Sequence, residues 1–231
     1  MKPAIIYMLE VLVCSGVLLA AYAILLERRV KFRWCRLYLL LTTFAAALIP
    51  LLRIPVWPGR VVAAAPAIPP DLPVWMGEVP DEGGSFAVTP EIFCLGLYLL
   101  GAVLIAGVMA WQVFRIHRLR RGAEISRTGD YTLVRTRQEI ASFSFLRTIY
   151  VWDKTPAGEL AAILAHESSH IAHRHSIERI LMELMKALLW WNPFAWIAAR
   201  RLTEAEEFEA DNDVLSSGYD RAEYMLSLIH I

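Results

Sequence analysis

The pattern with the clearest chemical meaning is the sequence HESSH at 166–170, inside the apolar run AGELAAILAHESSHIAHRH. On a helix, residues four apart share a face, so His166 and His170 present two imidazoles one turn apart. Two imidazoles at this spacing can bind one Zn²⁺, and the Glu167 carboxylate can then reach a metal-bound water. Four of the six histidines lie between residues 166 and 175, which scattered use of histidine on a polar helix face would rarely give. The pattern therefore predicts one zinc ion on this helix.

A catalytic zinc site needs a third protein ligand and leaves one position for water. The metzincin pattern, with a glycine and a third histidine just downstream, is excluded because this chain has His173 and Ser176 at those positions. Glu207 and Asp211 form an E-x-x-A-D pattern on a helix predicted over 194–217, where both share one face. Glu207 would complete a His₂Glu site, and Asp211 would accept a hydrogen bond from a ligand imidazole.

Other acidic residues compete with Glu207 for the role of third ligand. They are Glu178, Glu183, Glu204, Glu206 and Glu209, most of which are expected to be surface charges. Glu206 is the nearest rival, because a shift of one residue rotates the helix face by about 100°. The Ala-Asp pair that closes the pattern favours Glu207.

Three apolar runs precede the zinc motif and indicate a membrane protein. Of the 231 residues, 57% are hydrophobic and 20% are charged, against about 25% charged in typical soluble domains. The runs cover 3–26, 37–52 and 91–114, and a bilayer is crossed by about 20 apolar residues. The second run is short, and snorkelling of Trp34 and Arg36 is expected to extend it. Basic and acidic residues number 23 each, so we expect no direct binding of nucleic acid.

The distribution of basic residues predicts the orientation of these spans. Residues 27–36 and 115–121 are rich in Arg and Lys, whereas residues 53–90 are rich in Pro and contain acidic residues. Because cytoplasmic loops collect Lys and Arg, we expect the N-terminus and the Pro-rich loop outside the cell. The chain then divides into a transmembrane region, 1–114, and a cytoplasmic or membrane-interface metallopeptidase domain, 115–231.

Within the second part, two segments rich in β-branched and aromatic residues predict a small sheet. They are 131–136 and 144–152, and the sequence SFSF at 142–145 overlaps the second. An extended substrate is expected to pair with the free edge of this strand at Ser144 and Phe145.

The remaining segments of this part are predicted to be helical. Thr155 is expected to cap the zinc helix. Residues 177–191 have apolar positions at helical spacing, which predicts a helix in the membrane interface or packed against the spans. Two tryptophans near its end fit an aromatic belt. The Asn-Pro pair at 192–193 then reverses the chain, which allows Glu207 to return to the two histidines.

Together these features resemble the BlaR/MecR family of membrane zinc metallopeptidases, which are antirepressor and β-lactam-sensor proteins. The matching features, spread over nearly the whole chain, are the apolar start ending in LLERR, F-x-x-x-R-L-Y-L-L at 32–40, SFSF, HESSHIAHRH, WWNP and E-x-x-A-D. The resemblance implies that His166, His170 and Glu207 hold the metal and that Glu167 is the catalytic acid. It also implies a zincin-like (gluzincin) α+β domain joined to three transmembrane helices, a mainly α fold. His175 matches a histidine common nine residues after the first, which lies either behind a ligand residue or at the surface.

The function implied by this resemblance is a signalling protease in a bacterial-type inner membrane. After a signal, such a zinc metalloendopeptidase cleaves a cytoplasmic repressor, itself, or both. Family members usually continue into a fourth span and often a sensor domain, so the end at Ile231 leads us to expect a fragment or a truncated reading frame. None of the four lysines completes a Ser-x-x-Lys motif, so β-lactam sensing is not expected.

Two other interpretations of the sequence stay open. The first is a membrane quality-control protease similar to HtpX or the CAAX-prenyl proteases, which share both zinc motifs; three spans before the motif and the W-N-P turn favour the BlaR/MecR type. The second is a non-catalytic membrane transducer with a structural zinc. Glu167 argues against it, because a purely structural site has no need of that acid.

Overall fold

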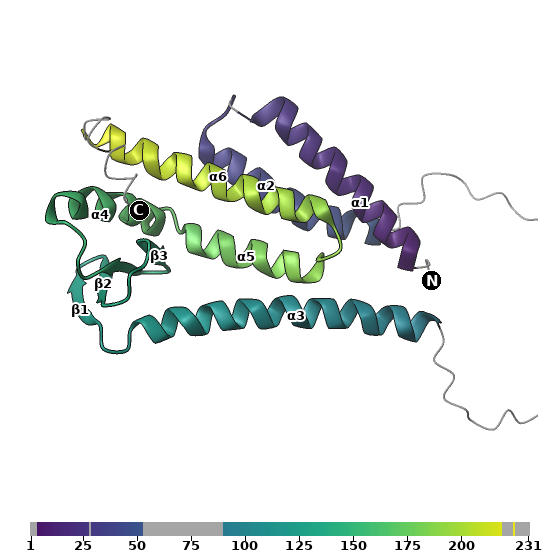
Figure 1. Cartoon of the computed structure of the whole chain (residues 1–231). Coiled ribbons are helices and arrows are strands. Elements are labelled where there is room, and N and C mark those ends of the chain that lie inside the picture. The colour runs from purple at the N-terminus through teal and green to yellow at the C-terminus, as the bar shows by residue number, and fades with distance from the viewer. Residues whose placement is uncertain (1–3, 28, 53–89, 219–223, 225–231) are drawn as a thin grey trace, which may run out of the picture.

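The structure is a computed structural model that describes residues 4–27, 29–52, 90–218 and 224. Long helices lie side by side, and a small sheet lies at one end of them (Figure 1). The helices are α1 (Ala4–Ala21), α2 (Phe32–Leu48), α3 (Pro90–Leu119), α4 (Ala157–Ala172), α5 (His175–Leu188) and α6 (Pro193–Ser216). The strands are β1 (Glu124–Thr128), β2 (Tyr131–Thr136), β3 (Phe143–Phe145) and β4 (Thr148–Trp152).

Within the described part of the chain, three helical segments are long and apolar enough to cross a membrane: Ala4–Leu26, Phe32–Leu51 and Ile92–Leu119. The first includes a π-helical turn that follows α1. The second begins at Phe32, earlier than the predicted run at 37–52, and therefore includes Arg36. Its side chain does not snorkel to solvent as predicted but is buried against acidic side chains of α5 and α6. The predicted Pro-rich loop lies outside the described residues, apart from its last residue, which begins α3.

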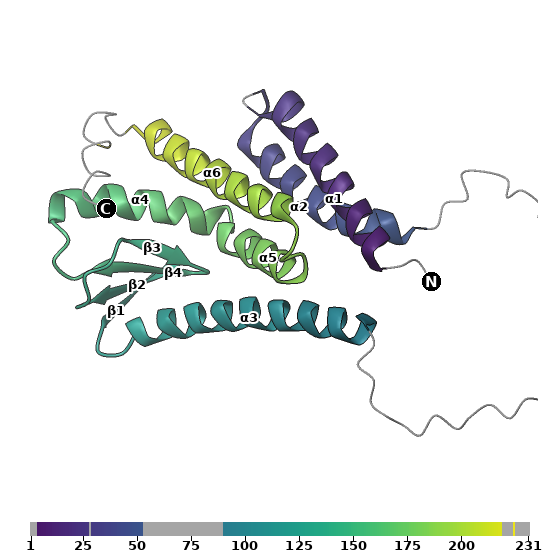
Figure 2. The ribbon, with the colours of Figure 1, turned by 45° about the vertical axis from the view of Figure 1, so that its right-hand side comes forward.

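Helices α5 and α6 form a hairpin that runs along the spans. Figures 1 and 2 both show α5 between α3 and α6, with α6 beside α2. The helix predicted over 177–191 therefore packs against the spans, which was one of its two predicted positions. The pair Asn192-Pro193 turns the chain as expected, and the Asn192 side chain caps α6 by accepting a hydrogen bond from the Phe194 N–H (3.0 Å).

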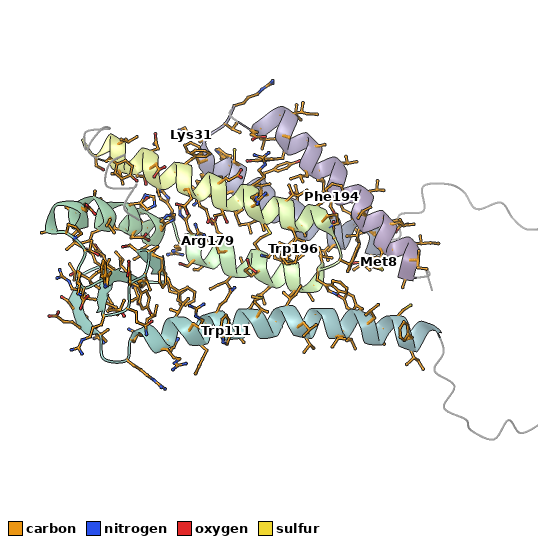
Figure 3. All side chains as sticks on the ribbon, viewed as in Figure 1. Met8, Lys31, Trp111, Arg179, Phe194 and Trp196 are labelled. Carbon is orange, nitrogen blue, oxygen red and sulfur yellow. The ribbon has the colours of Figure 1, made fainter. Side chains whose placement is uncertain are left out.

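The tip of this hairpin contacts the first and the third span. The buried Asn192 amide donates to Ser15 Oγ of α1 (2.8 Å), and Trp190 Nε1 donates to the Tyr98 carbonyl of α3 (3.2 Å). A Cβ on Gly16 of α1 would lie 3.1 Å from the ring of Phe194, which Figure 3 shows between α6 and α1. At 1.5 Å per helical residue, Ser15 lies roughly 16 Å from the end of its span, about half the depth of a bilayer core. The aromatic belt predicted for the two tryptophans near this tip stays a prediction.

The sheet has the strand order β1-β2-β4-β3. Strands β2 and β4 are parallel, and the two outer pairs are antiparallel. The strand predicted over 144–152 is in fact a hairpin, because Leu146 adopts a left-handed conformation (φ 54°) and its N–H is held by the Ser176 hydroxyl. Strand β4 is thus internal and buried, and β3, which carries Ser144 and Phe145, is the edge strand.

Helix α4 packs on this sheet through an apolar core. The core consists of Leu133, Ile149, Val151 and Ile163. Thr155 does not cap α4 as predicted; its hydroxyl donates to the Trp152 carbonyl (2.9 Å), and the residue before the helix is Pro156. The helix ends at Ala172, and α5 begins three residues later at His175. Arg174, the residue before α5, adopts a left-handed conformation (φ 59°). This tight junction brings the end of α4, the start of α5 and the end of α6 together.

Candidate metal centre

Two histidines of α4 and one glutamate of α6 converge where these helices pack against each other. The Nε2 atoms of His166 and His170 lie 3.2 Å apart. Glu207 Oε2 lies 3.4 Å from His166 Nε2 and 3.6 Å from His170 Nε2. Both histidines are buried, whereas Glu207 is half-exposed, so the group opens toward the surface. The predicted chain reversal therefore does bring Glu207 to the paired imidazoles.

The size of this triangle fits a zinc ion. Zinc binds imidazole nitrogen and carboxylate oxygen at about 2.0–2.2 Å, so two ligands of a tetrahedral zinc lie about 3.3–3.5 Å apart. The three measured sides, 3.2, 3.4 and 3.6 Å, lie close to that edge length. Two neutral imidazoles and one carboxylate also form the donor set of catalytic sites that keep a fourth position for water. Among the described residues, these three are the group that can hold a metal ion.

On its outer side, His166 contacts an aspartate and a tyrosine. Its Nδ1 lies 3.2 Å from Asp211 Oδ1 and 2.7 Å from the Tyr224 hydroxyl, which itself donates to Asp211 Oδ1 (2.7 Å). Asp211 thus lies where the prediction put it, next to a ligand imidazole. Burial and the Asp211 carboxylate raise the pKa of Tyr224, so its hydroxyl stays protonated. Sequence reasoning missed Tyr224, because an isolated tyrosine beyond α6 has no spacing that marks it.

The Nδ1 side of the His170 ring faces the protein interior instead. Its Nδ1 lies 2.6 Å from Nδ1 of His175, a side chain that is only 1% exposed. His175 Nε2 lies 3.3 Å from Glu209 Oε2, which in turn lies 2.9 Å from Arg36 Nη1. Burial and the positive charge of Arg36 lower the pKa of His175 to about 2, so its ring is neutral. Of the two roles left open for His175, the geometry places it behind a candidate ligand and not at the surface.

The rival acids point elsewhere. Glu206 is fully buried and faces Arg179 Nε (2.5 Å) instead of the histidines. Burial raises the pKa of Glu206 to about 7 even though Arg179 opposes the shift. Glu183 pairs with Lys186, and Glu204 pairs with Arg201. The expectation that most rivals are surface charges is wrong for Glu206 and Glu209, because both are buried against arginines.

Arg179 also holds the candidate third ligand. Its Nη2 donates to Glu207 Oε1 (2.7 Å), which leaves Oε2 facing the two imidazoles. Figure 3 shows Arg179 on α5, next to α6. Burial opposes ionisation of Glu207, but hydrogen bonds with His166, His170 and Arg179 outweigh it and hold its pKa well below the ordinary value. The third donor is therefore an ionised carboxylate in a fixed orientation.

The other predicted site residues lie on α4 and on the edge of the sheet. Glu167 is buried directly after His166. Ser144 pairs with Ile149 in β3, and Figure 2 shows β3 as the strand of the sheet nearest to α4. His173 contacts Asp213 Oδ2 (2.8 Å) and is not part of the candidate ligand group.

Comparison with protein families gives one match. Residues 146–231 match the family model described as BlaR1 peptidase M56. The match confirms the resemblance predicted from the sequence, and its range contains all three candidate ligands and Glu167. A comparison with curated proteins finds no match.

Proposed function

We propose, from the match of residues 146–231 to the model of the M56 peptidase family, that this chain is a membrane-embedded zinc metalloendopeptidase. The observation that carries the proposal is the triangle of His166, His170 and Glu207, whose sides match the ligand spacing of zinc. In this proposal α4 to α6 and the sheet form a zincin-like (gluzincin) domain. Helix α4 packed on a sheet with an outer strand nearby supports that assignment.

The chemistry divides between the metal and the side chains around it. When bound, zinc lowers the pKa of water and polarises the scissile carbonyl. Glu167 accepts the proton of the attacking water and passes it to the leaving amine. Asp211 and Tyr224 keep the His166 ring oriented, and Arg179 keeps one Glu207 oxygen turned to the imidazoles.

The edge strand β3 is the proposed binding site for substrate. A peptide that adds to β3 as a further strand would expose its backbone in extended form, and Ser144 and Phe145 would lie opposite it. Because β4 is internal, β3 alone offers this edge near α4. The substrate class is therefore an extended segment of a protein chain.

The proposed location is the cytoplasmic face of a bacterial-type inner membrane. The connection between α1 and α2 and the end of α3 lie at the same end of the molecule as the sheet and α4 (Figure 1). These connections carry the basic clusters, which collect on the cytoplasmic side. A cytoplasmic repressor, or the chain itself, would then be the substrate of a signalling system of the antirepressor type.

The first experiment tests Glu167 as the proton carrier. The full chain, purified in detergent, is incubated with zinc and with unfolded casein, and self-cleavage is followed in parallel. Glu167→Gln should keep its zinc and lose about 10²–10⁴-fold in cleavage rate. Glu159→Gln, on the same helix, is the matched control and should cleave like the wild type. Equal cleavage by wild type and Glu167→Gln would contradict the proposal, and so would a zinc-loaded wild type that cleaves nothing, which favours a transducer with structural zinc.

The second experiment separates signalling from protein turnover. Proteins cleaved in cells are compared between wild type and Glu167→Gln by mass spectrometry of new N-termini. Selective cleavage of one regulatory protein, or of the chain itself, is the expected outcome. Cleavage of many damaged membrane proteins would replace the antirepressor function with the quality-control function.

The third experiment tests the edge strand. Ser144→Pro removes a backbone N–H from β3 and should raise KM or lower kcat, because proline cannot donate to an added strand. Thr128→Pro, on the opposite edge in β1, is the control. If the two variants cleave equally fast with full zinc content, β3 does not bind the substrate.

A further inference from the structure

A continuous path of polar contacts leads from the candidate ligand His170 to the second span. The path runs through His175 of α5 and Glu209 of α6 to Arg36 of α2. The three steps measure 2.6, 3.3 and 2.9 Å between heavy atoms. All four side chains are buried, so water does not complete or replace these contacts easily. Four helices thus meet through one chain of side chains.

The hydrogen atoms along this path can be assigned from the geometry. His170 turns Nε2 toward the other ligand atoms, so its Nδ1 carries the hydrogen. That Nδ1–H donates to His175 Nδ1, which leaves the hydrogen of the neutral His175 ring on Nε2. Nε2–H then faces the Glu209 carboxylate. Each donor meets an acceptor, which fixes the rotation of both rings.

Arg36 is the cation at the end of this path. It is 4% exposed and faces two carboxylates, Glu209 at 2.9 Å and Glu178 at 3.5 Å. The contact with Glu209 is an ion pair of opposite charges rather than a well-aligned hydrogen bond. Without Arg36, the buried Glu209 and the partly buried Glu178 would lose the cation that faces both of them, and Glu209 is the one that contacts His175. The position of Glu209 therefore depends on Arg36.

We propose that Arg36 is a positioning residue of the metal centre, acting on His170 through Glu209 and His175. The inference rests on the proposed function and adds a connection from span to site: a shift of α2 against α5 and α6 separates Arg36 from Glu209 and releases the His170 ring. The second span thereby controls how well the site holds its metal. The family match begins at residue 146, so Arg36 lies outside it.

Zinc affinity tests this proposal without recourse to cleavage. The full-length wild type and variants are purified in detergent, and the zinc Kd is measured by competition with a chelating dye. Arg36→Gln should weaken zinc binding about 10–100-fold, the usual effect of losing an outer partner of a ligand histidine. Arg36→Lys keeps the charge and should recover part of the affinity. Arg33→Gln, an exposed arginine one turn away in α2, is the control and should bind like the wild type.

A double-mutant cycle separates this path from a general loss of stability. If Arg36 acts through His175, the loss of affinity in Arg36→Gln/His175→Gln should be close to that of the stronger single variant. Independent, additive losses would overturn the proposal. Unchanged zinc Kd in Arg36→Gln would also overturn it, even if the zinc-free variant unfolds at a lower temperature. A wild type that binds no zinc, or binds it equally after His166→Ala, would remove the proposed function itself, so the two failures are distinguishable.

Discussion

The two candidate ligand histidines lie one turn apart on α4, yet different parts of the chain hold them. His166 is held by Asp211 and Tyr224, both of which follow α4 in sequence and lie within the family match. His170 is held through Glu209 and ultimately by a residue of the second span. The side chain of Asp211 is 37% exposed, whereas that of Glu209 is 12% exposed.

This difference in burial indicates different consequences of damage. A charge that loses its partner in the interior keeps its full cost of burial, whereas water can replace the partner of a half-exposed group. The contacts of His166 lie within the family match, and we expect the loss of a partner there to cost less. The contacts of His170 reach the second span, and we expect the loss of a partner there to cost more.

The largest loss of zinc binding should come from removing either candidate ligand histidine. At this level His166 and His170 should not differ, because each would supply one metal-binding nitrogen. His166→Ala and His170→Ala should each weaken zinc binding by more than about 100-fold, beyond what outer partners contribute. The zinc content of protein purified in detergent measures this directly. His173→Ala is the control, because His173 pairs with Asp213 rather than with the ligand group. Near-normal zinc in either ligand variant would contradict the site.

The next largest effect is expected on the buried side. Glu209→Ala leaves His175 without its acceptor and Arg36 with Glu178 alone. Removing one partner of a buried ion pair typically costs about 3–5 kcal/mol, and the remaining Glu178 should keep the loss near the lower limit. Thermal unfolding of the zinc-free protein measures it. A loss equal to that of Asp211→Ala would erase the predicted contrast.

A smaller effect is expected on the side of His166, where Tyr224 is buried but Asp211 is half-exposed. Tyr224→Phe removes the hydroxyl that bridges His166 and Asp211 but leaves their direct contact of 3.2 Å. The loss should be about 1 kcal/mol in stability, the ordinary value of one hydrogen bond, with zinc Kd changing about 10-fold or less. Titration with zinc in a calorimeter checks the second value. A loss as large as that of His166→Ala would make Tyr224 far more important than its geometry indicates.

The smallest loss of stability is expected at Asp213 of α6. Its carboxylate contacts Ser169 of α4 and His173, the residue that follows α4. Burial opposes ionisation of Asp213, but hydrogen bonds from Ser169 and His173 hold its pKa below the ordinary 3.8. A lowered carboxyl pKa stabilises the fold above the ordinary value, and this contribution disappears as the pH falls through the lowered one. Asp213→Asn should therefore cost less than about 1 kcal/mol at pH 7 and nothing in strong acid. Urea unfolding of the zinc-free protein at both pH values tests the sign.

The ligand group was predictable from the sequence because helical periodicity alone determines which residues share a face. His166 and His170 follow from a spacing of four, and Glu207 and Asp211 from the same spacing on α6. The choice of Glu207 over Glu206 rested on the Ala-Asp pair that closes the pattern, and in the structure Glu207 faces the histidines whereas Glu206 faces Arg179.

The outer partners were not predictable in the same way. Arg36 and Tyr224 come from segments far from α4 in sequence, and only the packing of α2 and α6 brings them close. The strand over 144–152 was predicted as one element because its residues all favour strands, while the turn depends on a left-handed Leu146 that no composition reveals. The depth of the hairpin tip likewise depends on close packing at Gly16.

The buried amide of Asn192 at the hairpin tip also bears on how the protein is assembled. Hydrocarbon offers no partner to an amide, so α5 and α6 are stable at this depth only once Ser15 is in place to receive it. The first span is synthesised well before this contact can form, because α6 comes later in the chain. Glu207 lies on α6 too, so the three candidate ligands come together only after α6 has been synthesised and packed.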